Sequence, residues 1–225
     1  MRSRPIIAID GPSGVGKSTV ARGLAHELKF NYIDTGSLYR AVAMLADQDG
    51  VSWESPSNLV ELIGKQRFTF DHQGNLSVNN VKVGNEIRTP HISSGASSIA
   101  QYREIRSSLL DVQRNIGADG GVVLEGRDIG TVVFKDAEMK FYLTASVATR
   151  AARRHAELVA RGENISLKQV EDDQKKRDKT DTEREVSPLK KATDAKEINC
   201  DNLNALQVIE LIKSIVVAKF PLTSM

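Results

Sequence analysis

The feature that most restricts this chain is a glycine-rich segment near its start, Gly11-Pro12-Ser13-Gly14-Val15-Gly16-Lys17-Ser18. It fits the pattern of glycine, any four residues, glycine, lysine and then serine or threonine. Glycines permit a turn in which successive backbone N–H groups point inward and form a cradle for phosphate oxygens. A helix that begins directly after the loop adds the positive end of its dipole. The segment therefore predicts a phosphate-binding loop between a strand and a helix.

The rest of the chain alternates between strand and helix patterns. An apolar strand (5–10) precedes the loop and an amphipathic helix (17–29) follows it. Further strands are expected at 30–34, 121–124, 139–144 and 197–200, and further helices at 35–45 with Thr35 as its cap, 56–63, 146–161 and 204–219, with one long helix from 90 to 116. This alternation favours an α/β fold with a five-stranded parallel sheet covered on both faces, in a single domain of residues 1–225.

Two segments depart from this alternation. Residues 68–83 contain three short runs with a period of two, separated by turn signals, which predict a small antiparallel sheet inserted within residues 64–90. Residues 163–191 are strongly charged and contain no long apolar run. A mobile flap that closes over anions is polar and weakly packed, so we expect a helical lid across residues 155–190.

Composition excludes several kinds of protein. The 225 residues carry 31 basic and 29 acidic side chains, and a net charge of +2 argues against nucleic-acid binding through phosphate neutralisation. The single cysteine, Cys200, cannot form an internal disulfide, which fits a reducing compartment. The chain shows no signal-peptide pattern and no apolar stretch of about 18 residues, so we expect a cytoplasmic protein without a membrane span.

The phosphate loop alone does not separate GTPase switches, motor ATPases and kinases. An Asn-Lys-x-Asp guanine-reading motif is absent, and the strand that ends at Glu125 runs into an arginine-bearing turn rather than the Asp-Glu of a motor. Arg40, Arg127 and Arg150 each follow a predicted strand, so they can converge at the edge of the sheet where ligands of open α/β folds bind. Because guanidinium groups suit phosphate oxygens, this placement favours a kinase with two phosphorylated substrates.

Four motifs make the chain resemble the bacterial cytidylate kinases. They are Gly-Pro-Ser-Gly-Val-Gly-Lys-Ser-Thr (11–19), Asp-Thr-Gly-Ser-Leu-Tyr-Arg (34–40), Glu-Gly-Arg-Asp-Ile-Gly-Thr-Val-Val-Phe (125–134) and Arg-Asp-x-x-Asp-x-x-Arg (177–184) followed by Ser-Pro-Leu. Their order and spacing agree over nearly the full length. The resemblance implies a P-loop kinase core with a monophosphate-binding insertion and a lid, and transfer of the ATP γ-phosphoryl group to CMP or dCMP. Glu125 and Thr35 are mild departures, since some members have Asp and many have Ser at these positions.

The resemblance also implies roles for individual residues. The residues expected to bind ATP are Gly11, Pro12, Ser13, Gly14, Val15, Gly16, Lys17, Ser18, Thr19, Arg150 and Arg154. Those expected to bind CMP are Thr35, Ser97 and Arg106 near the nucleoside, Arg40 and Arg127 at the phosphate, Asp128 and Arg184 at the cytosine edge, and Arg177 and Asp181 near the ribose. Lys17, Arg127 and Arg154 would act in catalysis, and Ser18 would hold Mg²⁺ together with the ATP phosphates.

The expected reaction is an in-line transfer that needs no strong general base, because the acceptor phosphate oxygen is already anionic near neutral pH. Catalysis would rest on positioning and charge neutralisation. Two alternatives stay open: another small-molecule P-loop kinase with UMP or a different acceptor, and a nucleotide-binding regulator with little turnover. Binding of nucleic acid is disfavoured, and a monomer is expected because no strong apolar surface stripe is visible.

Overall fold

The computed structural model describes residues 2 and 4–221, and its core is a five-stranded sheet whose strands all run parallel. The strand order is β2 (Asn31–Asp34), β6 (Val122–Gly126), β1 (Ile6–Asp10), β7 (Met139–Thr144) and β8 (Lys196–Asn199). The central strand β1 is buried along its whole length, as expected for a strand covered on both faces. The predicted strands and parallel sheet are confirmed, with small shifts at the strand ends.

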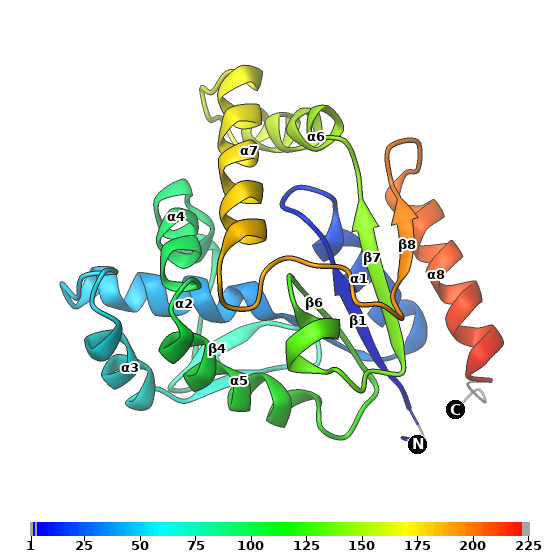
Figure 1. Cartoon of the computed structure of the whole chain (residues 1–225), viewed down its shortest axis with the longest axis horizontal. Coiled ribbons are helices and arrows are strands. Elements are labelled where there is room, and N and C mark those ends of the chain that lie inside the picture. Colours follow the sequence, from blue (N-terminus) through cyan, green and yellow to red (C-terminus); the bar gives the residue numbers. More distant parts are fainter. Residues whose placement is uncertain (1, 3, 222–225) are drawn as a thin grey trace.

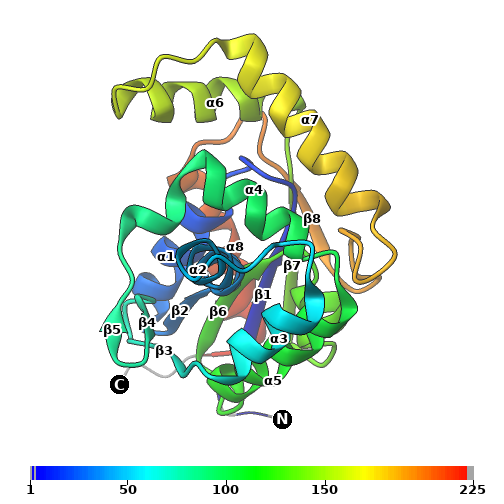
Figure 2. The same ribbon diagram turned by 90° about the vertical axis from the view of Figure 1, so that its left-hand side faces the viewer.

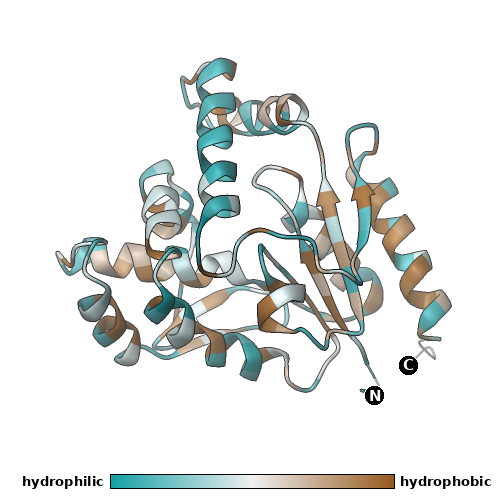
Figure 3. Ribbon diagram, in the orientation of Figure 1, coloured by the Kyte–Doolittle hydropathy of each residue, from teal (hydrophilic) through white to brown (hydrophobic). Residues whose placement is uncertain are grey.

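Helices cover both faces of this sheet (Figure 1). On one face, Ile7 and Ile9 of β1 belong to an apolar cluster with α1 (Lys17–Leu28) and α8 (Ala205–Lys219). On the other face, Ile6 and Ala8 pack with the segment after β6, which includes the π-helical turn η2 (Ile129–Val133). Figure 3 shows the central strands of the sheet as largely hydrophobic. The alternation of side chains along β1 thus assigns each face its own core.

A second body of helices stands beside β2. The helices α2 (Thr35–Gln48), α3 (Pro56–Gly64), α4 (Pro90–Ile99) and α5 (Arg103–Gly117) share an apolar cluster with the inserted strands. The insertion is an antiparallel sheet of β3 (Phe68–Phe70), β4 (Leu76–Val78) and β5 (Val81–Lys82), followed by the short 3₁₀ helix η1 (Asn85–Arg88). The predicted antiparallel insertion is therefore confirmed.

The arginine-rich and charged segments form two helices above the ends of the main strands. Figure 2 shows α6 (Val147–Ala160) and α7 (Leu167–Glu183) crossing the top of the molecule, and Figure 3 shows α7 as largely hydrophilic. A small apolar cluster of Ala151, Leu158 and Val170 joins the two helices. Among the described residues, no helix is long and apolar enough to cross a membrane.

Two sequence-based expectations about helices were wrong. The single long helix after Pro90 is interrupted between Ile99 and Arg103, and the carbonyl of Ala100 at this break accepts a hydrogen bond from the Arg106 guanidinium (3.2 Å). Thr35 does not cap α2, because Asp34 takes that position and its carboxylate accepts the N–H of Ser37 (3.2 Å). In both places a charged side chain bonds to a backbone group a few residues away in the chain.

The second apolar cluster can be tested at Leu109, which is fully buried on α5. Leu109→Ala leaves a cavity among α3 and α5, and we expect it to lower the free energy of unfolding by about 2–5 kcal/mol. Leu206→Ala on α8 is the matched control, because Leu206 is 73% exposed and its removal should change stability by less than about 0.5 kcal/mol. Urea denaturation measures both, and equal losses would contradict the assigned core.

Candidate active site

The five parallel strands end at one edge of the sheet, and a large cleft opens there. Its volume is about 2310 Å³, and residues of the phosphate loop, α2, α4, the turn after β6, α6 and α7 line it. Most predicted site residues meet in this cleft: Ser13, Gly14, Val15, Gly16, Lys17, Ser18, Thr19, Thr35, Arg40, Ser97, Arg106, Arg127, Asp128, Arg154, Arg177, Asp181 and Arg184. The fold therefore joins segments that are far apart in the sequence into one site.

The phosphate loop has the geometry that its sequence predicts. It connects β1 to α1, and Gly16 precedes the first turn of α1 with a left-handed backbone (φ 99°). The Lys17 ammonium donates hydrogen bonds to the carbonyls of Gly11 (2.8 Å) and Pro12 (2.7 Å). At Gly11 a β-carbon would lie 2.4 Å from the carbonyl oxygen of Leu143, so only glycine fits between β1 and β7. The loop is thus held tightly against the sheet, with Lys17 folded across it.

Lys17 is buried, and its surroundings disfavour the charged form. Burial and the nearby Arg127 guanidinium lower the pKa of Lys17 to about 7, while Glu125 and Asp181 act in the opposite direction. A buried cation beside another cation is stabilised by an anion. The lysine and Arg127 therefore define a place where negative charge is favoured.

A second group of cations lies around Asp34, at the end of β2. The Asp34 carboxylate accepts an ion-paired hydrogen bond from Arg40 (2.6 Å) and lies 3.3 Å from Arg88 of η1. Burial acts to raise the pKa of Asp34, but Arg40 and Arg88 outweigh it and hold the pKa below its usual value. Asp34 thus ties α2 and the inserted segment to the end of the sheet.

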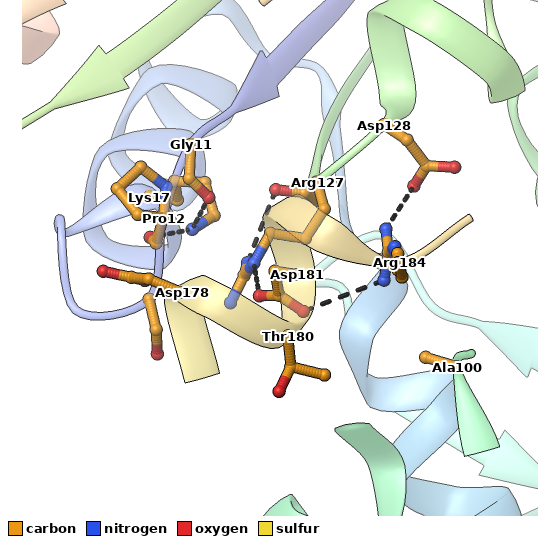
Figure 4. Close-up of polar contacts among 12 residues, drawn as sticks. Gly11, Pro12, Lys17, Ala100, Arg127, Asp128, Asp178, Thr180, Asp181 and Arg184 are labelled. Carbon is orange, nitrogen blue, oxygen red and sulfur yellow. Dashed lines mark hydrogen bonds and ion pairs between the residues drawn. The ribbon is translucent and has the colours of Figure 1, made fainter. Parts of the chain in front are cut away.

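A separate chain of ion pairs joins the turn after β6 to α7 and α5 (Figure 4). Arg127 donates to Asp181 (2.7 Å), and Arg184 lies 3.8 Å from Asp181 and 4.0 Å from Asp128. Asp128 in turn accepts a hydrogen bond from Arg106 on α5. All of these groups are largely buried, so each charge depends on its neighbour for compensation.

Arg177 stands out within this network. Its Nε atom is buried and finds no hydrogen-bond partner among the described residues. Burial and the neighbouring Arg127 lower the pKa of Arg177 to about 10, and Arg40 and Arg154 also disfavour its charge. Four guanidinium groups therefore crowd the same region, which makes the region suited to a polyanion.

Three of the predicted residues do not line the cleft, and a fourth lies at its wall. Arg154 on α6 forms an ion pair with Glu157 (3.1 Å) and is partly exposed at the cleft wall. Gly11 and Pro12 belong to the loop, and their carbonyls accept the hydrogen bonds of Lys17. Arg150 is buried and directs its guanidinium to the carbonyl of Ser13 (2.8 Å) instead of lining the cleft.

Three residues that were not predicted as site residues also line the cleft: Asp34, Arg88 and Glu125. Glu125 is buried at the end of β6 and accepts hydrogen bonds from Tyr32 and Ser18, while its carbonyl accepts one from Thr35 (2.7 Å). Burial and the Asp34 carboxylate raise the pKa of Glu125. Asp34 and Glu125 lie at the ends of predicted strands, where ligands of open α/β folds bind. The reasoning that identified Arg40 from its place after a strand could therefore have found them. Arg88 carries no such signal because it lies in the insertion.

The phosphate loop, the parallel sheet and the arginine-lined cleft define a P-loop kinase. Comparison with known proteins then specifies the family. The family model for cytidylate kinase matches residues 7–218. Cytidylate kinase of Citrifermentans bemidjiense is 44% identical over 94% of this chain and 92% of the relative, and that of Bacillus cereus is 42% identical over 98% and 99%. The chain belongs to the cytidylate kinase family.

One similar protein is longer and bifunctional. The chain is 43% identical to the bifunctional pantoate ligase/cytidylate kinase of Prochlorococcus marinus subsp. pastoris over 96% of its own length, which covers 43% of that longer protein. The residues aligned there correspond to nearly the whole of this chain.

The pKa of Lys17 leads to a measurable proton exchange. A lysine with a pKa of about 7 is mostly neutral at about pH 8, and a bound triphosphate favours its charged form. We therefore expect ATP binding at about pH 8 to take up close to one proton per site. Calorimetric titration in two buffers of different ionisation enthalpy measures this uptake.

The Lys17→Arg variant is the control for this experiment. Its guanidinium stays charged at every accessible pH, so this variant should take up no proton at that position. Equal uptake by both proteins would show that a group other than Lys17 titrates on binding.

Proposed function

We propose that this protein transfers the γ-phosphoryl group of ATP to CMP or dCMP and releases ADP and the corresponding diphosphate. The observation that carries the proposal is the single cleft in which Lys17 of the phosphate loop lies in the field of Arg127, with Arg40 and Arg177 nearby. Membership of the cytidylate kinase family specifies the acceptor. The cleft alone would fit several phosphorylated acceptors.

We assign the donor triphosphate to the loop of residues 11–19. Backbone N–H groups of the loop and the positive end of α1 would receive the phosphates, and Lys17 would leave the Gly11 and Pro12 carbonyls to reach the outer phosphates. Arg154 would contact the triphosphate from α6, where it is partly exposed at the cleft wall and pairs with Glu157.

The residues around Ser18 fit a magnesium ion. Ser18 offers a hydroxyl beside the buried Glu125 carboxylate, and oxygen ligands of this kind suit Mg²⁺. Among the described residues there is no cluster of three or more acidic, His or Cys side chains that could hold a metal, so phosphate oxygens and water would supply the remaining ligands. When bound, Mg²⁺ neutralises charge on the β- and γ-phosphates.

The acceptor would occupy the other half of the cleft. We assign its phosphate to Arg40 and Arg127, its ribose to Arg177 and Asp181, and its base to Thr35, Ser97, Arg106, Asp128 and Arg184. The ion pairs of these residues support the assignment, because the carboxylates of Asp34 and Asp181 already hold Arg40 and Arg127 toward the cleft (2.6 and 2.7 Å). Prearranged donors need no reorganisation when a phosphate arrives.

Transfer would proceed in line between the two phosphates. The acceptor oxygen is anionic, so no side chain must remove a proton, and Lys17, Arg127 and Arg154 would neutralise the charge on the transferring group. We further propose that residues 1–225 act as one domain in the cytoplasm as a monomer, with residues 64–90 binding the monophosphate and residues 155–190 acting as the lid.

Acceptor choice tests this proposal directly. With ATP and magnesium, ADP release should be fastest with CMP or dCMP and much slower with UMP, AMP, GMP or no acceptor, as measured by a coupled assay. Fastest turnover with UMP or another acceptor would replace the acceptor but keep the kinase. Slow hydrolysis that ignores every acceptor would leave a nucleotide-binding regulator.

Arg127 should carry much of the catalytic effect. Arg127→Ala removes one cation from the transferring group, and we expect a loss of about 3 kcal/mol in transition-state stabilisation, roughly a hundredfold in kcat. Arg103→Ala is the matched control, because Arg103 is exposed at the start of α5 and does not line the cleft. An unchanged kcat in a folded Arg127→Ala variant would remove Arg127 from the mechanism.

A further inference from the structure

One face of α7 rests on the rest of the molecule, and its character changes along the helix. Val170, Gln174, Asp178 and Asp181 recur at helical spacing on this inner face, whereas Asp172 lies exposed on the outside. Val170 packs with Ala151 and Leu158 of α6. Beyond Val170 the inner face is polar, and polar bonds of its next two residues go to Arg150 of α6, which in turn donates to the phosphate loop.

Arg150 of α6 is the centre of these polar bonds. Its guanidinium donates to the carbonyl of Ala145 (3.0 Å), to the carbonyl of Ser13 in the phosphate loop (2.8 Å) and to the carboxylate of Asp178 on α7 (2.6 Å). The side chain is only 4% exposed. Arg150 therefore connects three segments and has each of its nitrogen atoms engaged by the protein itself.

Gln174 brings α7 into direct contact with the same loop. Its side-chain amide donates to the carbonyl of Arg150 (3.2 Å). A β-carbon on Gly14 would lie 2.4 Å from that amide nitrogen, and Gly14 also has a left-handed backbone (φ 75°). The absence of a side chain at Gly14 thus lets the helix lie against the loop.

Two buried hydrogen-bond acceptors of α7 lack a donor at this junction. The carbonyl oxygen of the Gln174 side chain and one carboxylate oxygen of Asp178 are buried and accept no hydrogen bond from the described residues. A buried acceptor without a donor weakens the contact that buries it. The junction of α7 with Arg150, and through Arg150 with the loop, is therefore held by a few directional bonds. It separates more easily than the apolar contact of Val170 with Ala151 and Leu158.

We propose that Arg150, Gln174 and Asp178 form a latch that couples the position of α7 to the conformation of the phosphate loop. They act as positioning residues for phosphoryl transfer. With the latch engaged, Arg177 and Asp181 of the same helix are held over the cleft opposite Lys17, and water is kept from the donor phosphate. The latch rests on the proposed function, and it differs from the role of ATP contact that the resemblance implies for Arg150.

The Asp178→Asn variant tests the latch. It removes the charge that pairs with Arg150 and keeps the size of the side chain, so we expect the ratio of acceptor-independent ATP hydrolysis to transfer onto CMP to rise about tenfold. Asp172→Asn is the matched control, because it removes an exposed ion pair with Lys168 from the same helix and should leave the ratio unchanged. An unchanged ratio in folded Asp178→Asn would overturn the proposal.

A second measurement reports on α7 itself. Hydrogen exchange of the α7 amides should slow when a non-hydrolysable ATP analogue binds, and this slowing should be lost in Asp178→Asn and in Arg150→Lys but kept in Asp172→Asn. Combining the two latch changes should add little to either one alone, because both break the same contact. Fully additive effects, or slowing that survives in both variants, would overturn the latch. If the natural protein hydrolyses ATP but phosphorylates no acceptor, the proposed function fails while the exchange experiment still tests the coupling.

Discussion

Crowding of like charges within one cleft is the constraint on which the site depends. Arg127 and Arg40 lie close enough to Arg177 to disfavour its charged form. Asp34 and Asp181 each accept from one of these arginines, and each is buried. Burying a pair in this way gains little net stability by itself. The ion pairs instead fix geometry, because they hold the guanidinium groups of Arg40 and Arg127 in position.

The sheet supplies the frame for this arrangement. Parallel pairing sets Asp10 of β1 opposite Gly126 of β6, so the phosphate loop and the arginine-bearing turn leave the sheet side by side. The Asp10 carboxylate also accepts the N–H groups of Ile129 and Gly130 (2.8 Å each), and burial raises its pKa to about 6. The distance between the phosphate loop and the arginine-bearing turn is therefore set by the centre of the sheet.

The two ends of the cleft differ in how firmly they are built. The side that includes α2, α4 and α5 rests on a large apolar cluster shared by these helices. The cover formed by α7 has few apolar contacts beyond Val170 and depends on ion pairs and hydrogen bonds. Polar contacts exchange readily with water and phosphate, whereas apolar packing does not. This division gives the cleft one wall that is packed by apolar contacts and one wall that is held mainly by polar contacts.

The sequence by itself determined the features that depend on residues close together in the chain. The phosphate loop, the alternation of strands and helices and the antiparallel insertion all follow from local backbone geometry and periodicity, and the strand-end rule placed Arg40 and Arg127 at the correct edge. Most other site residues, such as Ser97 and Arg184, came from the resemblance to a family.

Only the tertiary structure decided which distant groups meet. The position of Arg88 beside Asp34 and the burial of Arg150 against Ser13 both depend on partners far away in the chain. A charged residue in a buried position needs a partner of opposite charge, but the packing of the helices and strands decides which residue becomes that partner. Periodicity carries no information about that choice, because it describes one element at a time.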